Sequence, residues 1–174
     1  MSLKSNLTRA FGLQPRGPLP AAALYARALS LARDPAWFSA GGVPDTLDGR
    51  FDMLALVVAL LVLRCQALDL HQTEADLADR FTEDMDATLR EIGISDLAIS
   101  KQVGNTVGAL GGRISAYRAA LAQGDEVVAD ALTRNLYRGE APPEPILAWA
   151  VTETRALESR LARATAEAID RGEP

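Results

Sequence analysis

Acidic side chains crowd one stretch of the sequence, at Asp76, Asp79, Glu83, Asp84 and Asp86. Carboxylates one helical turn apart can bind Mg²⁺, and helical diphosphate-processing enzymes place two such clusters on facing helices. Asp48 and Asp52 are the candidates for a second cluster, but no clear set of basic side chains for a diphosphate accompanies them. We therefore favour a solvated helix face with an Asp86–Arg90 pair, and keep a magnesium-dependent enzyme as the alternative.

Asp84 differs from the other acids because it lies at the edge of an apolar stripe. It follows Phe81 by three residues and precedes Thr88 by four. A carboxylate at the boundary of a core is unfavourable unless it has a partner. We predict that Arg50 and Asp84 form an ion pair that fixes the register of two helices.

Glycines recur inside a predicted helix at Gly104, Gly108, Gly111 and Gly112. Each destabilises a helix interior by about 1 kcal/mol relative to Ala, so the series calls for an explanation. A ridge without side chains permits close approach of another backbone. Tight packing inside the bundle is our favoured interpretation, and docking of a partner's helix on Gly104, Gly108 and Gly112 is the alternative.

The sequence contains one His, His71, and one Cys, Cys65. Neither a disulfide within the chain nor a common His/Cys metal site can be built from them. We expect Cys65 in the core and His71 at the end of a helix, and we assign no catalytic, metal-binding or cofactor-binding residue. A small bundle that binds haem or quinone remains a further alternative.

The apolar residues favour helices over strands, because 31 Ala and 25 Leu stand against 9 Val and 6 Ile. We predict an all-α, single-domain, irregular bundle of about seven to eight helices around a central apolar helix at 47–70. The other expected helices span 2–11, 20–33, 35–38, 73–92, 95–122, 125–137 and 144–169, with Thr73 capping the fourth of these. Prolines at 15, 18 and 20 separate a basic arm and linker (1–19) from the helical domain (20–174).

Charge is distributed unevenly along the chain. Residues 1–33 contain five basic residues and no acid, whereas residues 34–174 contain 13 basic and 23 acidic residues, a net charge of −10. The arm is expected either to contact a membrane surface or RNA, as on a ribosome, or to remain solvated; no DNA partner is expected. The apolar stretch Met53–Leu63 is too short to cross a bilayer. We expect a soluble protein, with peripheral attachment to a membrane as the alternative.

Two segments resemble a known family. Residues 42–54, GVPDTLDGRFDML, resemble the signature of the ubiquinol–cytochrome c chaperone family. A second stretch resembles it through Phe81, Asp84-Met85-Asp86, Leu89-Arg90-Glu91, Gly93, Asp96-Leu97 and Lys101. Weaker similarity follows at Gly112-Arg113 with Tyr117 and at Arg134-Asn135 with Tyr137. The resemblance spans roughly residues 20–140.

The resemblance implies an all-α, non-enzymatic factor that assists assembly of the cytochrome bc1 complex. It also implies a cytoplasmic location, with peripheral contact at the inner membrane. It implies binding to newly made cytochrome b or another component of that complex, together with a small partner protein. The exposed residues expected to form the client surface are Asp45, Asp48, Arg50, Asp86, Arg90 and Lys101. Each also has a structural interpretation: Asp48 as a helix N-cap, Arg50 as the partner of Asp84, and Asp86 with Arg90 as a surface pair.

The sequence departs from the family pattern at four positions. A histidine, two basic or bulky residues and an aromatic are replaced by Val57, Gly104, Thr106 and Gly111, respectively. We expect these changes to remove side chains from one surface and so to alter client binding there.

Overall fold

One apolar helix, α4 (Leu47–Ala67), organises the molecule. Every residue from Asp52 to Val62 is buried, so this helix is surrounded by protein on all sides, as its uniformly apolar sequence predicts. Thr46 caps its first turn, where the hydroxyl oxygen accepts a hydrogen bond from the Gly49 amide at 3.1 Å. α4 ends before the predicted residue 70 because Asp69 adopts a left-handed conformation, with φ of 56°.

The computed structural model describes residues 21–91 and 96–174, without the side chains of Leu89 and residues 96–103. The predicted helix 2–11, the arm at 1–19 and the side chain of Lys101 lie outside this description. The remaining helices are α2 (Ala22–Ala32), α3 (Pro35–Ser39), α5 (His71–Glu91), α6 (Asp96–Leu121), α7 (Asp125–Asn135), α8 (Glu144–Ala162) and α9 (Ala166–Arg171). The all-α fold is therefore confirmed, and within the described ranges eight helices are present.

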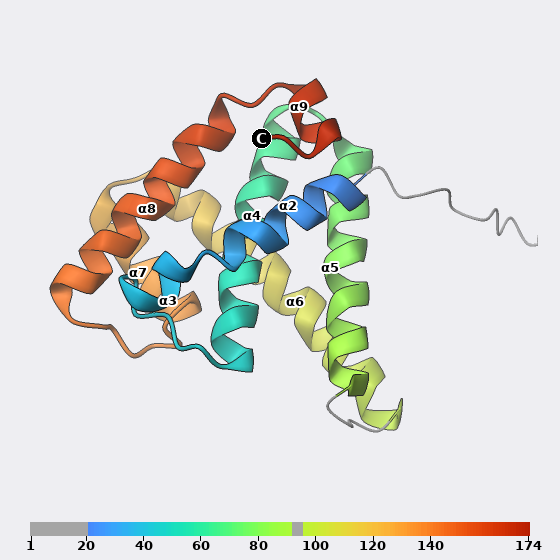
Figure 1. Cartoon of the computed structure of the whole chain (residues 1–174), viewed down its shortest axis with the longest axis horizontal. Coiled ribbons are helices and arrows are strands. Elements are labelled where there is room, and N and C mark those ends of the chain that lie inside the picture. Colours follow the sequence, from blue (N-terminus) through green and yellow to red (C-terminus); the bar gives the residue numbers. More distant parts are fainter. Residues whose placement is uncertain (1–20, 92–95) are drawn as a thin grey trace, which may run out of the picture.

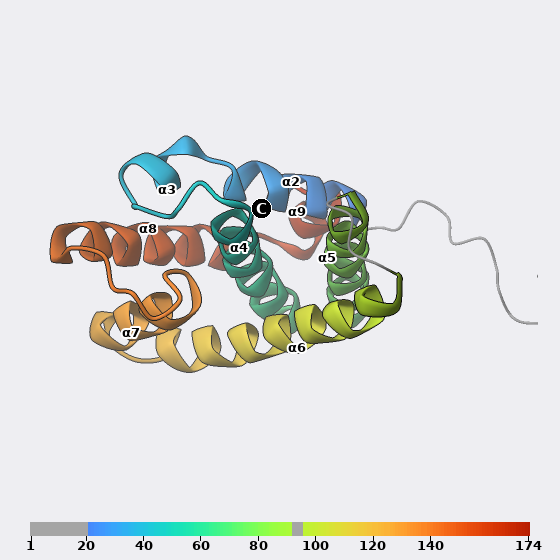
Figure 2. The same ribbon diagram turned by 90° about the horizontal axis from the view of Figure 1, so that it is seen from below.

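The helices surround α4 in layers. It packs against α2, α5, α6 and α8. Figure 2 shows α4 between α2 and α3 on one side and α6 and α7 on the other, with α5 and α8 on the two flanks. In Figure 1, α2 crosses in front of α4 and extends from α5 towards α3. No described helix has the length and apolarity needed to cross a membrane.

Two further predicted helix boundaries were wrong. The last helix is interrupted between α8 and α9, where Thr165 caps α9 by accepting from the Ala168 amide at 3.3 Å. The Ala164 carbonyl accepts from Arg64 of α4 (Nε at 3.1 Å), and the Ala168 amide donates to the Thr165 hydroxyl. α5 begins at His71, and the Thr73 hydroxyl bonds Asp170 at 3.2 Å rather than capping a helix.

Candidate functional site

A groove of about 960 Å³ opens at the end of the molecule where α4 begins. Its walls come from the end of α2, from α3, from the first turns of α4, from the second half of α5 and from Thr106 of α6. Apolar side chains line much of it: Leu29, Phe38, Leu47, Phe51, Leu54 and Met85. Among the described residues, Leu47 and Val107 are the large apolar side chains that stay exposed, and Leu47, at 52%, adds to the apolar lining of the groove.

Charged side chains surround this apolar lining, and three of them are predicted client residues: Asp45, Asp48 and Arg50. Arg50 donates from Nε to Asp45 at 2.6 Å, and both side chains are mostly exposed. This hydrogen bond from Arg50 is the main reason why the pKa of Asp45 is lowered. The first part of the predicted client surface is therefore assembled at the groove.

The predicted Arg50–Asp84 pair was wrong. Asp84 instead accepts a hydrogen bond at 2.7 Å from the hydroxyl of Tyr25 on α2. Burial and this bond both raise the pKa of the Tyr25 hydroxyl, so it remains a neutral donor. Arg50 bonds to Asp45 because that residue lies in the loop just before α4, within reach on the same side. Asp84 does link two helices, but these are α5 and α2.

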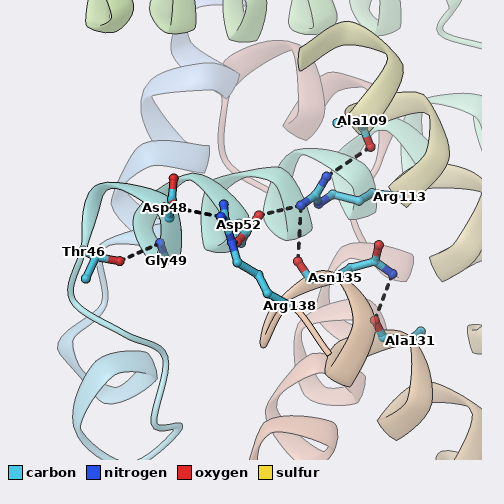
Figure 3. Close-up of polar contacts among 9 residues, drawn as sticks. All are labelled: Thr46, Asp48, Gly49, Asp52, Ala109, Arg113, Ala131, Asn135 and Arg138. Carbon is cyan, nitrogen blue, oxygen red and sulfur yellow. Dashed lines mark hydrogen bonds and ion pairs between the residues drawn. The ribbon is translucent and has the colours of Figure 1, made fainter. Parts of the chain in front are cut away.

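Behind the groove, Asp52 is fully buried and bonded to two arginines (Figure 3). Its Oδ1 accepts from Nη2 of Arg113 on α6, and its Oδ2 accepts from Nε of Arg138 after α7, each at 2.5 Å. Arg138 also donates to Asp48 at 2.7 Å. We call Asp52, Arg113 and Arg138 the Asp52 cluster. It joins α4, α6 and the α7–α8 loop through charge-assisted hydrogen bonds.

The surroundings of Arg113 complete this buried polar region. The guanidinium lies 5.3 Å from the centre of the Phe51 ring and is close to the Asn135 carbonyl, at 3.4 Å. The Tyr117 hydroxyl is buried nearby without a hydrogen-bond partner in the structure, and burial raises its pKa. Arg113 and Asn135, one residue from each of the weaker motifs of the sequence, thus meet beside Asp52.

The α7–α8 loop has its own anchor. Tyr137 is buried and donates its hydroxyl to the Gly41 carbonyl at 2.6 Å, and burial raises its pKa to about 12. The next residue, Arg138, has φ of 54°, a left-handed conformation that is uncommon for a residue with a side chain. This conformation accompanies the bonds from the Arg138 guanidinium to Asp48 and Asp52.

Two other predicted client residues do not lie with Asp45, Asp48 and Arg50 at the groove. Asp86 and Arg90 form the expected i, i+4 pair on α5, at 2.9 Å, but neither lines the groove. Asp48 is not the N-cap of α4, since Thr46 has that role; it lies in the first turn and binds Arg138. The structure therefore divides the expected surface into a groove set and a separate pair on α5.

The glycine ridge faces outward, so our favoured interpretation of packing inside the bundle was wrong. Within the described part of the chain, a Cβ atom added at Gly104, Gly108, Gly111 or Gly112 would meet no atom of another element within 4 Å. These positions lie on the side of α6 opposite the buried Leu110, Tyr117 and Ala120. Docking of a partner's helix on this ridge remains a prediction.

The four departures from the family pattern do not share one surface. Val57 is fully buried in α4, whereas Gly104 and Gly111 are exposed and Thr106 lines the groove. The expectation of a single altered surface was therefore wrong for Val57. A change there affects core packing.

The residues proposed for magnesium have other partners. Both oxygens of Asp52 bind arginines, and the buried Asp76 accepts from Gln72 at 2.9 Å. Over residues 21–91 and 96–174, no three His, Cys, Asp or Glu side chains lie where they could share a metal ion. His71 is 78% exposed at the start of α5, not at the end of α4 as expected, and its nearest acid is Glu74 at 4.0 Å. Cys65 is buried as predicted.

Sequence reasoning missed the roles of Arg138 and Tyr25. Asp52 gave a usable signal, because a carboxylate next to a long apolar run is buried and must find cationic partners. Nothing in the spacing identified those partners, which lie 61 and 86 residues away along the chain.

Comparison with known proteins agrees with this geometry. A crystal structure of the Cbp3 homolog from Brucella abortus superposes with a TM-score of 0.77 at 28% identity, covering 98% of this chain and 90% of that one. No curated protein matches the chain. The family model for the ubiquinol–cytochrome c chaperone matches residues 39–174, so the similarity extends through α8 and α9, beyond the expected limit near 140. The chain belongs to the ubiquinol–cytochrome c chaperone family.

Proposed function

We propose that this protein is a non-enzymatic chaperone in the assembly of the cytochrome bc1 complex, and that it holds newly made cytochrome b in the groove at the start of α4. The observation that carries the proposal is the groove itself, an open depression of about 960 Å³ with an apolar lining. A chaperone must cover apolar segments of its client without reacting with them, and an apolar depression serves that purpose.

The charges around the groove would give the complex its orientation. Asp45, Asp48 and Arg50 are all more than half exposed, so a client's charged groups can compete for them in water. Exposed ion pairs are weak and exchange readily, which suits a contact that must later be released to the assembling complex. Apolar burial would then provide affinity, and the charges would select the register.

Recovery of client from solubilised membranes of the source organism tests this function. Tagged protein carrying Leu47→Asp should lose most of the cytochrome b that the unaltered protein recovers, because a carboxylate would stand in the apolar lining. The fold should survive, since Leu47 is 52% exposed and an acidic residue suits the first turn of a helix.

Val107→Asp is the matched control. Val107 is 49% exposed on α6 and does not line the groove, so this variant should recover cytochrome b normally. If all three proteins recovered equal amounts of cytochrome b, the groove would not be the site where the client binds. If the unaltered protein enriched no bc1 component, cytochrome b would not be its client.

We also infer that the protein works beside the inner membrane on its cytoplasmic side, where a membrane protein client would be met. A small partner protein, as the family resemblance implies, would bind elsewhere than the groove. The outward glycine ridge of α6 offers such a place, since nothing in the described structure covers it. Mass spectrometry of the same recovered material would reveal a small partner as a co-enriched chain.

A further inference from the structure

The arm joins the folded domain at the start of α2, and the end of the same helix lines the groove. Ala21 is the N-cap of α2, and Tyr25, one helical turn later, bonds Asp84 in the groove wall. Leu29 and Ala32, further along α2, also line the groove. α2 begins beside α5 and extends towards α3 (Figure 1), so the arm is attached at the end of α2 opposite to the one that lines the groove.

The arm's sequence has the chemistry of a groove ligand. Leu3, Leu7 and Phe11 recur at four-residue spacing, which would align them on one face of a helix. The first 20 residues also contain Lys4, Arg9 and Arg16 and no acid. Such a segment combines an apolar face, which suits an apolar groove, with positive charge, which suits an acidic domain.

The linker is long enough for this contact. Residues 15–20 contain three prolines, and an extended polyproline-like segment of this length spans roughly 19 Å. From Ala21 to Leu29 the rise along α2 is roughly 12 Å. The residues before the linker can therefore reach the groove lining without any change in the folded domain.

Charge favours the same contact. Residues 34–174 have a net charge of −10, opposite in sign to the arm. The charged lining of the groove itself is balanced, with Asp45, Asp48 and Asp84 against Arg33, Arg50 and Arg138, so the attraction comes from the acidic domain as a whole. This attraction between an acidic body and a basic arm acts within one molecule, where the local concentration of the arm is high.

We propose that residues 3–11 of the chain's own arm occupy the groove when it holds no client, with Leu3, Leu7 and Phe11 against its apolar lining. Client would then bind by displacing the arm, so that the exposed apolar lining is covered between clients. The displacement rests on the proposed function of the groove, whereas the occupancy of the groove by the arm does not.

Paramagnetic labelling of the full-length chain tests the occupancy. A nitroxide attached to Ser5→Cys lies opposite the arm's apolar face, and Cys65 does not compete because it is buried and its pKa is raised to about 11. Amide signals of Leu47, Phe51 and Met85 should be broadened. Those of Leu63, Ala122 and Ala162, which line a second cavity of about 550 Å³, should keep their intensity.

The matched control is the same labelled chain with Leu3→Ser, Leu7→Ser and Phe11→Ser, in which the groove signals should recover. Unbroadened groove signals in the labelled chain would overturn the proposal. Broadening seen only when labelled chains are mixed with separate isotope-labelled chains would overturn it in favour of a second copy as the source of the arm.

Binding of the arm to anionic lipid vesicles, with groove signals that do not depend on the label, would overturn the proposal in favour of a membrane.

The proposed function and the proposed occupancy of the groove by the arm can fail separately. If the groove signals are broadened but no cytochrome b is recovered, the proposed chaperone function is refuted and the arm still occupies the groove. If cytochrome b is recovered normally but the groove signals are not broadened, the function stands and the arm does not occupy the groove.

Discussion

The first two turns of α4 present two faces that use the same chemistry for different purposes. On the inner face, Asp52 is fully buried and bonds Arg113 and Arg138, while Gly49 lies against the backbone of Pro44. On the outer face, Arg50 and Asp45 form an ion pair in water, and Leu47 stays half exposed beside them. Carboxylate–guanidinium contacts occur on both faces at similar distances, 2.5 and 2.6 Å.

The difference between the faces is burial. A buried carboxylate that loses its partners leaves uncompensated charge in the protein, whereas an exposed one is solvated by water. The inner face therefore holds α4, α6 and the α7–α8 loop in one arrangement. The outer face can exchange its contacts, as a docking surface must. Residues 45–52 thus contain a structural anchor and a candidate binding surface interleaved along one helix.

Removal of the buried carboxylate should have the largest effect. Asp52→Ala leaves the Arg113 guanidinium, which is 14% exposed, without its carboxylate, and should lower the free energy of unfolding by about 3–5 kcal/mol. Urea denaturation measures this loss. Asp48→Ala, which removes an exposed partner of the same Arg138, is the control and should change stability little. A loss of less than about 1 kcal/mol for Asp52→Ala would contradict the anchoring role of the cluster.

Two glycine substitutions should have opposite signs. In Gly49→Ala the new methyl group would overlap the Pro44 carbonyl, so the loop must shift, at a loss of about 1–3 kcal/mol. Gly108→Ala on α6 meets no atom within 4 Å and should stabilise the protein by about 1 kcal/mol. Thermal melting of both variants measures the contrast. An unchanged or raised melting temperature for Gly49→Ala would show that the close approach at Gly49 does not constrain the inner face.

Much of the fold follows from the sequence, because helix periodicity and end signals are local. The uniform apolarity of residues 53–63 predicts a surrounded helix, and Asp34-Pro35 predicts the start of α3, where Asp34 accepts from the Ala36 amide. The break at Thr165 is less visible, because Arg64, 100 residues away, binds the Ala164 carbonyl. Local patterns do not reveal such a contact.

The site was less predictable for the same reason. The motif at residues 42–54 indicated where the groove begins, but not which of its charges are buried. Asp84 finds Tyr25, not Arg50, and Asp52 finds two arginines from the second half of the chain. Periodicity placed four glycines on one face of α6 but did not say whether that face pointed inward. Partner choice across long separations depends on how the helices cross, which one sequence does not specify.

Arg138 connects the two faces and should show an intermediate effect. Its guanidinium is about half exposed and bonds both Asp52 and Asp48, so Arg138→Ala should lower the unfolding free energy by about 1 kcal/mol. Urea denaturation with Arg134→Ala as control, at an exposed position on α7, measures it. If Arg138→Ala lowered the free energy of unfolding as much as Asp52→Ala does, Arg138 rather than Arg113 would be the main stabilising partner of Asp52.

The outer pair should show the smallest effect on stability and a visible effect on ionisation. Arg50→Ala removes the hydrogen bond that lowers the pKa of Asp45, so this pKa should rise towards its ordinary value, as NMR titration of the side chain would measure. The urea midpoint should not change, because both groups are solvated once separated. Arg50→Glu should likewise fold normally and recover less cytochrome b, since it reverses a charge at the groove. If instead Arg50→Ala lowered the midpoint as Asp52→Ala does, the outer face would be a second anchor, and the division between structure and binding along this helix would fail.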